Sequence, residues 1–98
     1  MITVICKIEL ILFEVNSLKE KRMIIKSIIG RVKAKFNISI AEVGAHDLWG
    51  RSDIGFACVS TQTKHANQML DNIISFIERD GRAEIIKQEL EYVSLFEE

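Results

Sequence analysis

The apolar residues of this chain change their spacing four times, between the period of a strand and that of a helix. From Ile2 to Glu14 they recur at every second position, which predicts a long strand with one buried face. From Leu18 to Phe36 and from Thr63 to Arg79 they recur at every third or fourth position, which predicts two amphipathic helices. Shorter alternating runs predict three more strands, at 37–44, 51–62 and 82–95.

Local signals mark the ends of these elements. Ser17, with Glu20 three residues later, matches a capping box and places the start of the first helix. Gly81 suits the left-handed position that often follows a helix. In the last strand two adjacent isoleucines, Ile85 and Ile86, leave open which residues face inward.

The order strand, helix, strand, strand, helix, strand predicts an α+β fold of the ferredoxin-like βαββαβ type. We expect an antiparallel four-stranded sheet of order 4-1-3-2 with both helices on one face. The length of 98 residues suits one domain, residues 1–98. The first and third strands are neighbours in this topology, so we expect Cys6 and Cys58 to lie near each other in the core as free thiols.

Composition and motifs argue against several classes of function. The formal net charge is −1, so nucleic-acid binding would have to rest on a local basic patch. No run approaches the roughly 18 apolar residues of a membrane span, and no signal segment opens the chain, so we expect a cytoplasmic protein. We expect no metal, no cofactor and no enzymatic activity, because zinc or iron–sulfur spacings, phosphate loops and nucleophile elbows are missing.

The most basic segment is the first helix. Seven of the chain's thirteen basic residues lie between positions 19 and 35, against a single acid, Glu20. At 100° per residue, four of them form a ridge about 20 Å long beside the apolar stripe: Lys19, Arg22, Lys26 and Lys33. The other three fall on the opposite flank: Lys21, Arg31 and Lys35. The ridge either contacts a polyanion through phosphates or is the solvated flank of an ordinary helix.

A polar hairpin between the second and third strands is a second candidate site. It brings His46 and Asp47 near Glu42, a set that could transfer protons if a cleft enclosed it. The alternative is that Asp47 caps the turn and Arg51 pairs with a nearby acid. Trp49 and Arg51 also belong to the residue types that dominate binding interfaces.

The sheet face without helices is a third candidate. Phe56 shares the alternation of Ile54 and is expected to point inward, which argues against a base-stacking sheet of the RNA-recognition type. The uncovered face would instead carry an apolar patch suited to a homodimer or to a small ligand: Ile5, Ile11, Phe13, Val43, Ala57 and Val59.

Three motifs, "SLKEKR", "KFNISIAEVG" and "DLWGRSDIGFACVS", give the chain a resemblance to the YlxP-like family of small uncharacterised bacterial proteins. Gly50 departs from the glutamine that this family commonly has between the Trp and the Arg. The matching residues are Ser17, Leu18, Lys19, Lys21, Arg22, Phe36, Asn37, Ser39, Ala41, Glu42, Asp47, Trp49 and Arg51.

The resemblance implies a ferredoxin-like fold and a bacterial cytoplasmic protein. It also implies an association with RNA or the ribosome, because genes of the family often lie near those of translation factors, and it brings no activity or cofactor. The sequence therefore predicts a non-catalytic protein that contacts RNA or a ribosomal subunit, with a homodimeric or ligand-sensing module as the alternative. The expected binding residues are Lys19, Lys21, Arg22, Lys26, Lys33, Trp49 and Arg51.

Overall fold

The computed structural model describes residues 1–95 and contains the six predicted elements in the predicted order. The bounds differ from those expected by two residues or fewer. The elements are β1 (Ile2–Leu12), α1 (Leu18–Lys35), β2 (Ser39–Gly44), β3 (Arg51–Ser60), α2 (Thr63–Arg79) and β4 (Ala83–Ser94).

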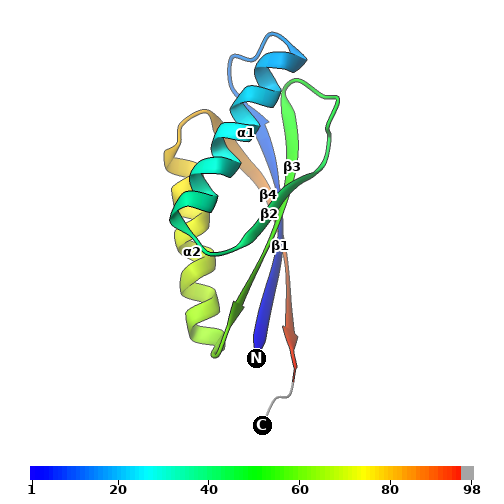
Figure 1. Cartoon of the computed structure of the whole chain (residues 1–98). Helices are drawn as coiled ribbons and strands as arrows, with labels where there is room; N and C mark the ends of the chain where they lie inside the picture. Colours follow the sequence, from blue (N-terminus) through cyan, green and yellow to red (C-terminus); the bar gives the residue numbers. More distant parts are fainter. Residues whose placement is uncertain (96–98) are drawn as a thin grey trace.

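The four strands form one antiparallel sheet of order β2-β3-β1-β4, which is the predicted order read from the other edge. Both helices pack on the same face of this sheet, and the opposite face is uncovered (Figure 1). β1 and β3 are the central strands and β2 is an edge strand. The ferredoxin-like prediction is therefore confirmed. No helix among residues 1–95 is long and apolar enough to cross a membrane.

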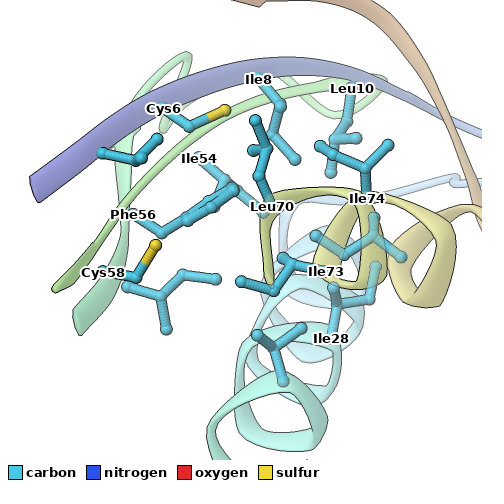
Figure 2. Close-up of a cluster of buried hydrophobic side chains, with 14 of the residues drawn as sticks. Cys6, Ile8, Leu10, Ile28, Ile54, Phe56, Cys58, Leu70, Ile73 and Ile74 are labelled. Atoms are coloured by element: carbon cyan, nitrogen blue, oxygen red, sulfur yellow. The ribbon is translucent and has the colours of Figure 1, made fainter. Parts of the chain in front are cut away.

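The core lies between the central strands and the two helices. Cys6 and Cys58 are buried free thiols there, as predicted, and burial, helped by the nearby Cys58, raises the pKa of Cys6 to about 11. Phe56 is also buried, so it is not displayed on the uncovered face. Figure 2 shows side chains from both sheet and helices meeting in this core: Cys6, Ile8, Leu10, Ile28, Ile54, Phe56, Cys58, Leu70, Ile73 and Ile74.

The cap at Ser17 and the left-handed Gly81 are present as predicted, and the structure shows which of the two adjacent isoleucines of β4 faces inward. The Ser17 hydroxyl accepts a hydrogen bond from the amide of Glu20 at 3.1 Å, and the Glu20 carboxylate reaches back to the amide of Asn16. Gly81 has φ of 84°, the left-handed conformation that glycine adopts without strain. Ile85 packs against the core and Ile86 is exposed. The β1–β4 pairing shifts its register at this point, which accounts for the two adjacent isoleucines.

Polar contacts fix α1 above the sheet at two places. Its start lies beside the β2–β3 hairpin, at the end of the molecule opposite the N-terminus (Figure 1). Farther along, Asp80 after α2 accepts hydrogen bonds from Arg31 of α1 and from Arg82, and Arg82 also donates to Ser27 of α1 at 3.0 Å. The first contact joins α1 to the hairpin that follows β2, and the second joins α1 to the segment between α2 and β4.

Candidate functional site

Lys21, near the start of α1, is a lysine whose side chain is completely buried. Its ammonium lies 2.6 Å from Glu42 Oε2 and donates to the backbone carbonyls of Ala45 and His46 at 2.9 and 3.0 Å. Each of its three N–H groups therefore has an acceptor, which is the condition under which a buried ammonium is tolerated. Lys21 thus holds α1 against the β2–β3 hairpin.

Glu42 on β2 is the anion of this buried pair, and Ser52 of β3 completes its surroundings. The buried Ser52 hydroxyl donates to the same carboxylate oxygen at 2.7 Å. Burial alone would raise the pKa of Glu42, but the hydrogen bonds from Lys21 and Ser52 and the charge of Lys21 outweigh it and lower the pKa. The carboxylate is ionised at neutral pH, and its charge is cancelled by that of Lys21.

The prediction that Lys21 contacts a polyanion is therefore wrong, because its ammonium is enclosed by protein. The sequence carries a signal for this position. Lys21 precedes Ile25, Ile28 and Val32 by four, seven and eleven residues, and these are the buried positions of α1. The helical spacing thus places Lys21 on the buried face, although its residue type is typical of the surface.

Two more of the seven cations of α1 have structural contacts. Arg31 binds Asp80 and stacks over the ring of Phe76, with its guanidinium carbon 5.4 Å from the ring centroid. The Lys35 ammonium lies 4.9 Å from the same centroid. Cations at such distances are attracted to the ring face. All three cations on the flank opposite the ridge thus make contacts within the fold.

The four ridge residues are all exposed, as are Arg31 and Lys35, but they differ in their contacts. Within residues 1–95, Lys19, Lys26 and Lys33 form no ion pair. Arg22 approaches Asp47 at 3.9 Å, with the two side chains 63% and 89% exposed. A pair so open to solvent contributes little to stability. The ridge is a row of positive charges that the described part of the chain leaves uncompensated.

A groove runs beneath the ridge, between α1 and the edge strand β2. Its volume is about 460 Å³, within the range of about 300–1,000 Å³ typical of small-molecule sites. Ile25 and Ile29 form an apolar floor, and the ionised Glu42 lines the side toward β2. The residues lining this α1–β2 groove are Arg22, Ile25, Lys26, Ile29, Gly30, Lys33 and Glu42.

The hairpin residues do not line the groove, although Asp47 approaches Arg22 at its rim. Arg51 binds Glu9 at 2.6 Å on the uncovered face of the sheet, which agrees with the expectation that it pairs with a nearby acid. Trp49 is exposed in the hairpin, so its role in binding stays a prediction. His46 makes a hydrogen-bond contact from Nε2 to the carbonyl of Glu42, and Asp47 stands open to solvent. Residues 1–95 contain no cluster of three or more acidic, His or Cys side chains placed to hold a metal ion.

The uncovered sheet face carries the expected apolar side chains. Ile5, Ile11, Phe13, Val43 and Val59 are exposed there, and Ala57 is half-buried. A shallow hollow of about 310 Å³ lies over Gly55 on this face. Glu9, Lys87 and Glu89 form ion pairs beside the patch, so this face carries both signs of charge.

Comparison with known proteins shows which chains this one is similar to. Residues 3–90 match the family model described as "Protein of unknown function (DUF503)". The uncharacterized protein YlxP of Bacillus subtilis (strain 168) is 41% identical over 70 residues, which cover 71% of this chain and 76% of that protein.

Solved structures similar to this chain include two designed proteins. The de novo designed protein LFR1 1 with ferredoxin fold superposes with a TM-score of 0.61 at 17% identity, covering 92% of this chain and 85% of the other. The de novo designed protein Foldit4 gives a TM-score of 0.52 at 14% identity, covering 97% and 99%. At such low identity these matches support the fold alone.

Proposed function

We propose that this chain, which belongs to the DUF503 family of proteins of unknown function, is a non-catalytic module that contacts the phosphates of RNA, such as ribosomal RNA, through the ridge of α1. The observation that supports this proposal is that the seven cations of α1 fall into two groups with different contacts. Three are engaged by the fold, and the four that remain lie in one row: Lys19, Arg22, Lys26 and Lys33.

The energetics of the row favour a ligand over a purely structural role. Like charges spaced three and four residues apart on a helix repel each other by a few tenths of a kcal/mol, so folding gains nothing from the row itself. The row extends about 20 Å, which spans several phosphates of a nucleic-acid backbone. Contacts of this kind position RNA without reading its bases, so binding would be weakened by salt.

A charge-reversal experiment tests the ridge. The variant Lys26→Glu/Lys33→Glu replaces two ridge cations by acids. The control variant Lys64→Glu/Arg79→Glu makes the same change in net charge at two exposed residues of α2. Binding to small ribosomal subunits and to a structured RNA would be measured for both variants and for the wild type. We expect a loss of about tenfold or more for the first variant and little change for the second. Equal loss in both variants, or no binding by the wild type, would reject the proposal.

A second candidate function is self-association through the uncovered sheet face. Five exposed apolar side chains lie beside charges of both signs, so a second copy related by a twofold axis could place acids opposite bases. Sedimentation at several concentrations tests this, with Val59→Glu as the variant expected to stay monomeric. A wild type that is monomeric throughout would reject self-association.

A further inference from the structure

Gly30 is a residue that the folding of α1 does not explain. It lies in the interior of an 18-residue helix, where glycine is less stable than alanine by about 1 kcal/mol. Glycine is normally retained in a helix where a neighbouring element packs too closely for a side chain. A Cβ built on Gly30 meets no atom within 4 Å, so no such neighbour exists among residues 1–95.

The open space beside Gly30 belongs to the α1–β2 groove. Arg22, Lys26, Gly30 and Lys33 follow one another at helical spacings of four, four and three residues, so Gly30 interrupts the row of cations. A ligand could approach the helix backbone at this gap, with an ammonium on either side. Close approach of a ligand to backbone is one of the few reasons to keep a glycine at such a position.

The chemistry of the groove changes from its rim to its floor. Lys26 and Lys33 on the rim suit a phosphate, whereas Ile25 and Ile29 on the floor suit a flat apolar surface. Glu42, on the β2 side, uses Oε2 for its bonds to Lys21 and Ser52. No hydrogen bond from the described residues reaches its other oxygen, Oε1, which leaves an anionic acceptor at the groove wall.

We propose that the groove holds one unpaired nucleotide of a bound RNA, with its phosphate over Gly30 between Lys26 and Lys33. Its base lies on Ile25 and Ile29 and donates an amino hydrogen to Glu42. This inference rests on the proposed function and adds to it a preference for single-stranded over double-stranded RNA. It also adds a preference for cytosine over uracil, because uracil presents a carbonyl where cytosine presents an amino group.

Filling the groove tests the inference without disturbing the core. Gly30→Leu places a side chain in the open space and restores helix propensity, so this variant is expected to fold at least as well as the wild type. Ala34→Leu is the matched control, because Ala34 is exposed on the same helix and does not line the groove. Thermal unfolding of both variants verifies that they are folded.

Binding would be measured for C and U oligonucleotides of about twelve nucleotides, a length suited to single-strand binders, and for a duplex of the same length. The wild type and Ala34→Leu should prefer single strands to the duplex and C to U. Gly30→Leu should lose about tenfold in single-strand affinity, together with both preferences. Poly-glutamate serves as a competitor of another chemical class.

The outcomes separate this inference from the proposed function. If Gly30→Leu binds all three RNAs as the wild type does, the groove is empty in the complex and the inference fails, while the ridge remains a phosphate site. If poly-glutamate displaces RNA from the wild type but not from Gly30→Leu, the groove takes an acidic peptide and the inference also fails. If the wild type binds no RNA, both proposals fail together.

Discussion

The substitution Lys21→Met tests the buried ion pair, which determines how α1 is held against the hairpin. Methionine has nearly the length of lysine without its charge, so the change removes the ammonium and leaves little cavity. The carboxylate of Glu42 and the carbonyls of Ala45 and His46 then lose their common donor. We expect the fold to persist with a large loss of stability.

The magnitude follows from the burial of the two partners. Removing one partner of a buried ion pair costs about 3–5 kcal/mol. The Glu42 side chain is 17% exposed and keeps its bond from Ser52, so Lys21→Met should cost about 3 kcal/mol, at the lower end. Glu42→Leu should cost about 5 kcal/mol, because it strands an ammonium that is fully buried. The double variant leaves neither charge unpaired, so it should cost less than Glu42→Leu alone.

The assay is urea unfolding followed by circular dichroism at neutral pH, with Lys19→Met as the control. Lys19 is exposed on the same turn, so its substitution should change the free energy of unfolding by less than about 0.5 kcal/mol. For a domain of this length, 3 kcal/mol corresponds to a fall in Tm of roughly 12–24 °C. If Lys21→Met matched the Lys19→Met control, the ion pair would contribute nothing and our account of the hairpin would be wrong.

Three further predictions concern pH, thiol chemistry and the helix. The lowered pKa of Glu42 means that its contribution to stability is complete above its ordinary value of 4.5 and is lost as pH falls through the folded-state pKa; the difference in unfolding free energy between wild type and Lys21→Met should therefore shrink in acid. Cys6 and Cys58 should resist a thiol reagent in the native protein at pH 8 and react in denaturant, since burial raises both pKa values; rapid native reaction would contradict their burial. Gly30→Ala should raise the unfolding free energy by about 1 kcal/mol, and a lower Tm would reveal a contact that the structure lacks.

The six elements could be predicted because their signals are local. The change of apolar period, the cap at Ser17 and the left-handed Gly81 each depend on a few adjacent residues. The adjacent isoleucines at 85 and 86 indicate an irregularity, but its place in the β1–β4 register depends on the partner strand. Topology then followed from the order of the elements.

The site was harder to predict because it depends on distances between elements. Helical angles alone predict the ridge, whereas the groove depends on the contact of Lys21 with Glu42, which holds α1 beside β2. Lys21 belongs to the predicted binding set only through the "SLKEKR" motif, whereas its helical angle lies between those of the buried Ile28 and Val32. The position of Arg51 on the uncovered face follows from its alternation with the buried Ser52, a signal that the sequence contains.

The salt dependence of RNA binding is the most direct test of the ridge as a phosphate site. Four phosphate contacts on a single strand should give a slope of about −3 in a plot of log binding constant against log salt concentration. Lys26→Glu/Lys33→Glu should reduce this slope by at least about 1.4, and Lys64→Glu/Arg79→Glu should leave it unchanged. A slope that is the same in all three proteins would show that RNA does not bind through α1.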